Sequence, residues 1–242
     1  MESYMDRQAK GSSAQPGDIS ITGESSWAGG EYRKVKVVGD STFNGATRCR
    51  QFKCTGTSVV KGSLDATEIK VTGTLALVAA EDGGRAQAPG NETTASGRES
   101  QYDLKAEEVK VLGELHVAGN CQAERIRLTG RIEVGGMLSA EQLSIQLKGS
   151  SRVHEIGGSR IEIGRGRGRL IQGLLGQHAV ATLKADAIEG DVIELEDAEV
   201  DVVRGHRIVI GPGCRIGLVE YTESLQVNPQ AEVREQRNRS RD

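Results

Sequence analysis

Histidine is the residue type in this sequence best suited to proton transfer at neutral pH. The chain has four histidines, at His116, His154, His178 and His206. A catalytic histidine works with a positioned carboxylate or nucleophile, and the sequence places none beside any of the four. We therefore expect solvated or packed histidines and no catalytic residue.

Cysteine is the second residue type that could carry chemistry, as a nucleophile or a metal ligand. The four cysteines, Cys49, Cys54, Cys121 and Cys214, include no Cys-x-x-Cys pair. They are also too sparse for a scaffold held by disulfides. We expect reduced thiols that pack as small apolar side chains, with no metal site and no cofactor.

Arginine and glycine alternate in one short stretch that contains Arg165, Arg167 and Arg169. Such a stretch can contact phosphate groups or anionic lipid head groups. No aromatic residues are interleaved, so an exposed solvated loop is the more ordinary interpretation. The formal net charge of -3 gives no overall attraction to nucleic acid, and no Walker-type or dinucleotide-binding motif is present.

The strongest pattern in the chain is an internal repeat of 17 residues. Glycines mark it first: Gly39, Gly56 and Gly73 are equally spaced, and the step from Gly113 to Gly130 has the same length. Apolar residues between the glycines also recur, as Leu64-x-Ala66-x-x-Ile69-x-Val71, Leu104-x-Ala106-x-x-Val109-x-Val111, Cys121-x-Ala123-x-x-Ile126-x-Leu128 and Leu138-x-Ala140-x-x-Leu143-x-Ile145. A repeat of this kind indicates a solenoid.

Apolar and polar residues alternate within each repeat, which is the period of a half-buried β-strand. Two or three strands of four to five residues would fill a turn and leave no room for a helix. Glycine suits the corners, where the backbone turns sharply. The sequence therefore predicts an all-β protein, a right-handed parallel β-helix of about 17 residues per turn.

Interruptions of the repeat set the expected boundaries. The repeat keeps its register across a polar Gly/Ser/Thr/Pro stretch after Leu77, so we interpret this stretch as a loop inserted into one continuous coil. A linker between two separate coils is the alternative. The expected segments are a disordered tail 1–16, a first block 17–78, an inserted loop 79–103, a second block 104–228 with an irregular excursion 164–182, and a frayed charged tail 229–242.

Two classes of enzyme share the β-solenoid architecture. Hexapeptide acyltransferases repeat every six residues, whereas this chain alternates steps of 6 and 11. Polysaccharide lyases and hydrolases would need a charged cluster and aromatic sugar platforms, which an aromatic content of 3% hardly supplies. Outward carboxylates such as Glu107 and Glu108 fit a solvated face. We expect a protein that is not an enzyme.

The ends of the coil are the expected sites of self-assembly. A stacked β-coil ends in unpaired backbone groups and an apolar cross-section, which soluble solenoids usually cover with capping elements. The sequence shows no amphipathic cap beside the first coil, around Ile19 and Ile21, or beside the last, around Leu225 and Val227. These four residues are the candidate contacts between copies, and contacts that do not close build a filament.

The N-terminal residues are polar where a secretory signal peptide would be apolar, and no apolar run is long enough to span a membrane. We expect a cytoplasmic protein without a transmembrane segment. Peripheral contact with a membrane stays open.

The repeat resembles that of the bactofilins, the polymer-forming cytoskeletal proteins of bacteria. The resemblance covers residues 35–78 and 104–163, and more loosely 188–228, and the segment Val59 to Gly73 illustrates it. It implies a triangular right-handed β-helix that forms filaments without nucleotide. It also implies a scaffold that localises envelope, shape or motility proteins, with other copies of itself as the first partner. A β-solenoid that binds a protein partner without polymerising is the alternative.

Overall fold

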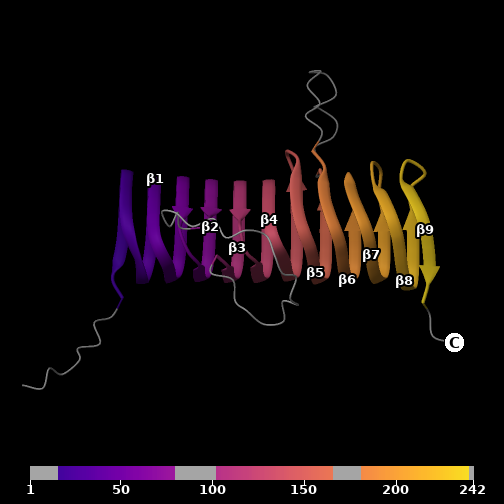
Figure 1. The fold of residues 1–242 in the computed structure, drawn as a ribbon, viewed down its shortest axis with the longest axis horizontal. Coiled ribbons are helices and arrows are strands. Elements are labelled where there is room, and N and C mark those ends of the chain that lie inside the picture. The colour runs from indigo at the N-terminus through magenta and orange to yellow at the C-terminus, as the bar shows by residue number, and fades with distance from the viewer. Residues whose placement is uncertain (1–15, 80–101, 166–180, 240–242) are drawn as a thin grey trace, which may run out of the picture.

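The chain forms a single elongated coil in which each turn stacks on the preceding one (Figure 1). The computed structural model describes residues 16–79, 102–165 and 181–239. In these residues nine parallel strands form one sheet, in the order of the sequence. The strands are β1 (Asp18–Val60), β2 (Leu64–Leu77), β3 (Leu104–Val117), β4 (Cys121–Leu147), β5 (Ser151–Gly164), β6 (Leu183–Leu195), β7 (Ala198–Ile210), β8 (Arg215–Val227) and β9 (Glu232–Asn238).

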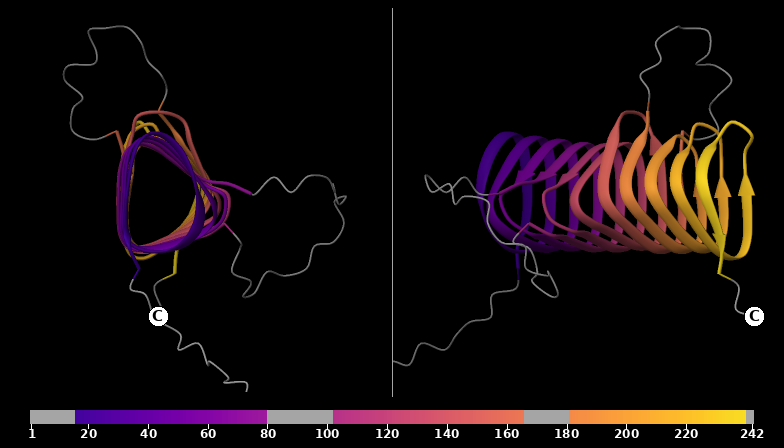
Figure 2. Two further views of the ribbon diagram at one scale, coloured as in Figure 1. Left: turned by 90° about the vertical axis from the view of Figure 1, so that its left-hand side faces the viewer. Right: turned by 45° about the vertical axis from the view of Figure 1, so that its right-hand side comes forward.

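Viewed along its axis, the coil has a rounded triangular outline (Figure 2). The strands bend around the corners without a break, so β1 alone covers 43 residues and more than two turns. This differs from the short strands expected from the alternation of apolar residues. The reason is that most corner residues keep their bonds to the turns on either side. The predicted all-β solenoid is confirmed.

The 17-residue register runs through the first half of the coil. Cys49 lies beside Ala66 in the next turn, and Ala66 lies beside Ala106. The second step spans the insertion, yet β2 and β3 pair along their whole lengths. The coil is therefore continuous across the insertion, as in the first of the two interpretations of that segment.

The spacing between turns varies more in the second half. Leu143 pairs with Ile161, Ile193 with Ile208, and Ile208 with Leu225. The register shifts between Val134 and Met137 and again between Gly205 and Arg207, where extra residues are accommodated. Inward apolar residues still stack on one another, which keeps the core continuous.

The core is a column of stacked aliphatic side chains that runs the length of the coil. Ile69, Val109 and Ile126 are fully buried in successive turns. Phe43 and Phe52 pack edge to face, with ring centroids 5.8 Å apart. In the described residues no buried side-chain nitrogen or oxygen lacks a hydrogen-bond partner. Ser41 and Ser58, for example, pair through their hydroxyl groups at 2.6 Å.

One corner requires glycine in turn after turn. Gly113 has a φ of +134°, a conformation that side chains with a Cβ rarely adopt. A Cβ at this position would also lie 2.1 Å from the carbonyl oxygen of Gly73 in the preceding turn. The same corner position is filled by Gly39, Gly56, Gly73, Gly113 and Gly130.

The expectation of a frayed tail after residue 228 is wrong for part of that segment. Residues 232–238 form β9, which pairs in parallel with β8. The segment has almost no apolar side chains, so the hydrophobic pattern gave no indication of a strand. Its backbone bonds to β8, and its arginines bond to a buried carboxylate described below.

Several expectations fall on residues outside the described part of the chain. These are the tail 1–15, residues 80–101 of the insertion, the excursion from 166 to 180, and the last residues 240–242. Arg167, Arg169 and His178 belong to these segments.

Candidate functional site: the two ends of the solenoid

The outermost described turn at the N-terminal end contains Ile19 and Ile21. Their side chains are only 9% and 3% exposed, and they belong to the same core cluster as Val35 and Val37 of the next turn. These two isoleucines are thus buried in the isolated chain, and their expected role as contacts between copies stays a prediction. The backbone of this turn still forms the outer edge of the sheet in the described residues.

Trp27 is the exposed apolar side chain of this end, at 40% exposure. It lies 16 residues before Phe43, the same spacing that separates Gly23 from Gly39 across the first two turns. Phe43 is fully buried. Trp27 therefore occupies the row of an inward aromatic residue, and no described turn precedes it to cover its outer side. Aligning the first turn with the second in the sequence places Trp27 opposite Phe43, and this could have identified Trp27 as a residue of the open end.

A bidentate ion pair fastens this first turn to the second. The Arg33 guanidinium donates to both carboxylate oxygens of Asp18, at 2.8 Å and 2.6 Å. The hydrogen bonds from Arg33 lower the pKa of Asp18. Both side chains are largely exposed, so the pair mainly fixes geometry.

At the other end, β9 covers only part of the last full turn. It pairs with residues 215–221 of β8 and does not reach Leu225 and Val227. Leu225 is half-buried against the core, whereas Val227 is 36% exposed. An apolar edge narrower than a whole turn thus lies at Leu225 and Val227, and their expected role as contacts between copies stays a prediction.

A buried carboxylate holds β9 in place. Glu220 of β8 is 3% exposed and accepts a hydrogen bond from Arg204 Nε at 2.9 Å. Arg239 Nη2 lies 2.8 Å from its other oxygen, and Arg237 Nη1 lies 3.7 Å away. The hydrogen bond from Arg204, together with the other two guanidinium groups, lowers the pKa of Glu220. This cluster ties the final half turn to the coil.

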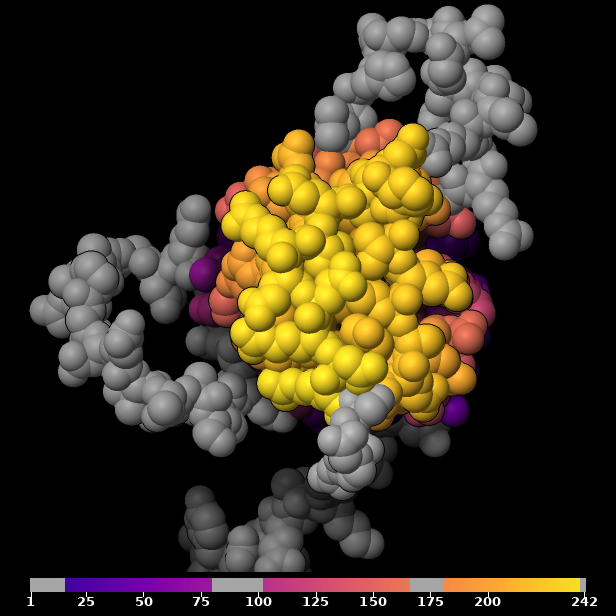
Figure 3. Space-filling view, turned by 90° about the vertical axis from the view of Figure 1, so that its right-hand side faces the viewer, coloured from indigo at the N-terminus to yellow at the C-terminus, as the bar shows by residue number. Residues whose placement is uncertain are grey.

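Figure 3 looks onto the C-terminal end of the molecule. Residues from the last strands spread over the whole cross-section, so the end is a filled surface rather than an open channel. The inward row that ends in Ile216 and Val219 continues in β9 as Val233 and Gln236. The end therefore combines a polar half, formed by β9, with the apolar half at Leu225 and Val227.

The four residues expected to mediate assembly are not brought together within one chain. Ile19 and Ile21 belong to the first turn of β1, and Leu225 and Val227 belong to β8 at the opposite end (Figure 1). Contact between the two groups requires a second copy of the chain.

The histidines depart from the sequence expectation in one respect, because carboxylates do lie near the three that are described. His154 Nδ1 is 2.7 Å from Asp186, and His116 Nδ1 is 3.4 Å from Glu133. His206 Nδ1 is 2.7 Å from the Thr222 hydroxyl group. His206 Nε2 is 3.6 Å from Asp191. Asp186, Glu133 and Asp191 come from neighbouring turns, which the linear sequence does not show to be adjacent, whereas Glu114, 3.3 Å from His116 Nε2, is only two residues away in the sequence. All three clusters lie at the surface, where ion pairs contribute little.

The cysteines are buried and free. Burial raises the pKa of Cys49 and Cys121 to about 12, and that of Cys214 to about 11. In the described part of the chain no group of three or more histidine, cysteine or acidic side chains could hold a metal ion. These residues contain no helix long and apolar enough to cross a membrane.

Arg165 is the one arginine of the Arg/Gly stretch within the described residues. Its Nε lies 2.8 Å from Asp197 Oδ2 on the next turn, so its charge is already paired. The expected anionic contact at Arg165, Arg167 and Arg169 stays a prediction.

Comparison with known proteins gives two relatives, both from Bacillus subtilis (strain 168). The uncharacterized protein YhbF is 41% identical over 85 residues, which are 35% of this chain and 34% of YhbF. The uncharacterized protein YhbE is 39% identical over 93 residues, which are 38% of each protein. The chain thus matches little more than a third of the length of these curated relatives. No family model and no solved structure matches it.

Proposed function

We propose that this protein is a non-enzymatic structural protein that assembles end to end into a polymer without nucleotide. The observation that carries the proposal is the uninterrupted parallel sheet from β1 to β9, whose first and last turns have no pairing strand on their outer side in the described residues. Further copies could extend such a sheet in both directions.

The physical reason lies in the strand edges. An edge strand presents unpaired backbone N–H and C=O groups, which pair readily with another strand. Here each edge also carries an exposed apolar side chain, Trp27 at one end and Val227 at the other. Docking a second copy would bury these side chains and continue the column of stacked core residues. A contact of this kind that does not close on itself propagates into a filament.

The resemblance to bactofilins supports the same proposal, and the two relatives come from a bacterium. We propose accordingly a bactofilin-like cytoskeletal scaffold in the bacterial cytoplasm. Its partners would be envelope, cell-shape or motility proteins recruited along the exposed faces of the coil.

Negative-stain electron microscopy of the purified protein without nucleotide tests this proposal. We expect filaments as wide as one or a few coils. Val227→Lys places a charge on the apolar edge at the C-terminal end and Trp27→Lys does so at the other end, so each variant should shorten or abolish the filaments. Leu225→Lys with Val227→Lys should have a stronger effect.

Val209→Lys is the matched control. Val209 is 37% exposed, close to the value for Val227, but it lies on β7 with a paired strand on each side. This variant should assemble normally. Discrete particles at high protein concentration would contradict the proposal and favour a solenoid that binds a protein partner without polymerising.

A further inference from the structure

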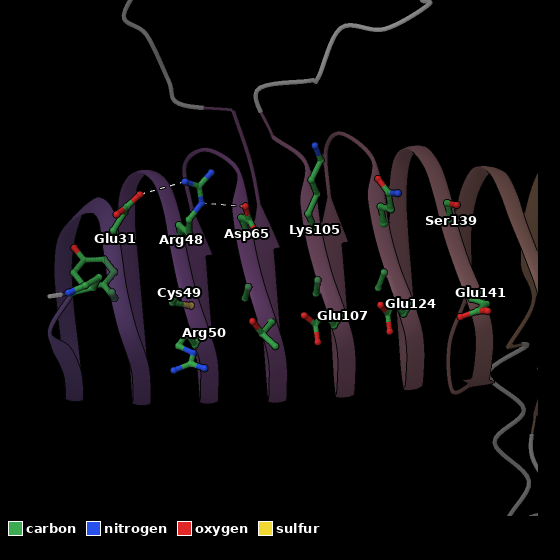
Figure 4. Close-up of a pocket in the computed structure, with 17 residues that line it drawn as sticks. Glu31, Arg48, Cys49, Arg50, Asp65, Lys105, Glu107, Glu124, Ser139 and Glu141 are labelled. Atoms are coloured by element: carbon green, nitrogen blue, oxygen red, sulfur yellow. Dashed lines mark hydrogen bonds and ion pairs between the residues drawn. The ribbon is translucent and has the colours of Figure 1, made fainter.

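A shallow groove of about 750 Å³ runs along one side of the first half of the coil. Its floor consists of small side chains in successive turns, such as Cys49, Ala66 and Ala123. Figure 4 shows the polar side chains along its two margins. The first margin carries Glu31, Arg48, Asp65, Lys105, Gln122 and Ser139, one residue per turn. The second carries Arg50, Thr67, Glu107, Glu124 and Glu141. Arg33 lies one turn before Arg50, just outside the groove, where its guanidinium bonds to Asp18.

The four charged residues of the first margin alternate in sign, and the first three of them pair with one another within the chain. Arg48 lies 3.3 Å from Glu31 and 3.2 Å from Asp65, its neighbours in the turns on either side. These contacts appear as dashed lines in Figure 4. The margin is therefore close to neutral along its length.

The second margin separates its charges instead. Two arginines occupy its N-terminal part, and three glutamates follow one another in the later turns. All are exposed, and in the described residues Arg50, Glu107 and Glu141 make no ion pair. Arg33 is paired with Asp18, and Glu124 lies 3.5 Å from Arg125. Like charges in adjacent strands, about 4.8 Å apart, repel each other. The isolated chain thus carries a repulsion that an oppositely charged partner would relieve.

A second copy of the chain has the required charges in the required order. Consider two copies facing each other across this groove, related by a two-fold axis that runs parallel to the strands and between the turns of Thr67 and Glu107. The axis reverses the order of the turns. Each margin of one copy therefore faces the same margin of the other copy, with the turns in the opposite order. On the second margin Arg50 then faces Glu124 of the other copy, and Arg33, which is paired with Asp18 in its own chain, lies opposite Glu141.

The first margin fits the same axis. Asp65 faces Lys105 of the other copy, Arg48 faces Gln122, and Glu31 faces Ser139. No two like charges meet on either margin, and each of the charged pairs occurs twice because the axis is two-fold. Sliding one copy by one turn loses this match. In one direction Arg48 would face Lys105 and Asp65 would face its own copy, and in the other direction Lys105 and Glu107 would each face their own copies.

We infer that this groove is the contact between two copies of the chain that lie side by side and antiparallel. The inference rests on the proposed function in one respect: within filaments the contact repeats along the length, so weak pairing of single copies becomes strong. A two-fold contact uses the same surface on both copies and closes at two, so it produces paired filaments rather than open sheets. The glutamate row, expected from the sequence to be a solvated face, forms half of this surface.

Sedimentation velocity on a variant blocked at its ends separates this contact from end-to-end assembly. In the Leu225→Lys, Val227→Lys background we expect a dimer that dissociates with rising salt, because charge pairs are screened. Arg50→Glu and Glu124→Arg should each weaken the dimer at least about tenfold, since each creates two like-charge contacts. Mixing the two variants should restore pairing, because every contact in the mixed dimer then joins opposite charges.

Lys53→Glu is the matched control, because it makes the same change in net charge on a different face of the coil. It should leave the dimer unchanged. The orientation is tested with Arg50→Cys and Glu124→Cys and a short bis-maleimide cross-linker. Cross-linking in the mixture, and in neither variant alone, supports the antiparallel arrangement. Cross-linking of Arg50→Cys with itself would contradict it.

The two proposals fail in different ways. Filaments of unchanged width in the Arg50→Glu variant, together with a monomeric end-blocked variant, would overturn the side-by-side contact and leave end-to-end assembly intact. Dimers that respond to the charge changes, in a protein that forms no filaments, would retain the side-by-side contact and overturn the polymer.

Discussion

Replacing Gly113 by alanine tests the stacking of turns more sharply than any change in the core. An added Cβ would lie 2.1 Å from the carbonyl oxygen of Gly73, whereas real Cβ atoms essentially never approach within 3.0 Å. The two turns must therefore separate locally by about 0.9 Å. Side-chain rearrangement cannot relieve this contact, because both the corner and its neighbour are backbone.

The magnitude follows from the bonds beside the corner. A separation of that size takes backbone N···O distances from about 2.9 Å to about 3.8 Å, beyond hydrogen-bond range. Two bonds lost at about 1 kcal/mol each, with partial burial of the unpaired groups, cost about 2 to 3 kcal/mol. The positive φ of Gly113 adds about 1 to 2 kcal/mol for a residue with a Cβ. We expect Gly113→Ala to lower the free energy of unfolding by about 3 to 5 kcal/mol in total.

Gly149→Ala is the control for this prediction. A Cβ at Gly149 would meet only the Arg131 side chain, at 4.0 Å, and its φ lies outside the left-handed region. The variant should be neutral or more stable by up to about 1 kcal/mol. Urea unfolding followed by circular dichroism compares the two in the end-blocked background. Equal midpoints for Gly113→Ala and Gly149→Ala would refute the argument that close contact between turns requires glycine.

Three further predictions concern the core, the thiols and the C-terminal turn. Ile126→Ala removes a fully buried side chain and should cost about 3 kcal/mol in urea unfolding; a loss below about 1 kcal/mol would contradict the stacked core. Because burial raises the pKa of Cys121 to about 12 and that of Cys214 to about 11, a thiol reagent at about pH 8 should label none of the four cysteines until the protein unfolds; rapid labelling of the folded protein would contradict their burial. The hydrogen bond from Arg204 lowers the pKa of Glu220, so its stabilising contribution is present above the ordinary carboxyl pKa and is lost as the pH falls through the lowered value. Glu220→Gln should therefore show a smaller loss of melting temperature between about pH 7 and about pH 3 than the parent protein, and an unchanged loss would contradict the role of this carboxylate.

Much of the fold follows from the sequence because inward residues and corner glycines recur at a fixed spacing. The predicted recurrence of Leu64 as Leu104 and of Leu104 as Cys121 is found as pairs in the sheet. The alternation of apolar and polar residues identified which side chains are buried. It did so even for Cys121, where a cysteine takes the place of an aliphatic residue.

The pattern gave less information where stability comes from polar contacts. Strand β9 has little apolar character, and its attachment through Arg237 and Arg239 to Glu220 depends on residues in different turns. The sequence pointed to the isoleucines of the first turn as the contacts between copies, whereas the exposed apolar side chain of that turn is Trp27. Charge rows such as that of the groove become visible only when turns are placed in register, because their members are far apart in the sequence.

The most direct test of the central claim is the repeat along the axis of the assembled filament, measured by cryo-electron microscopy or fibre diffraction. End-to-end stacking makes the filament axis coincide with the axis of the coil, so strands cross it and a meridional reflection at about 4.8 Å is expected. Filaments that lack this reflection on the meridian, or show it on the equator, would contradict end-to-end stacking of the solenoid.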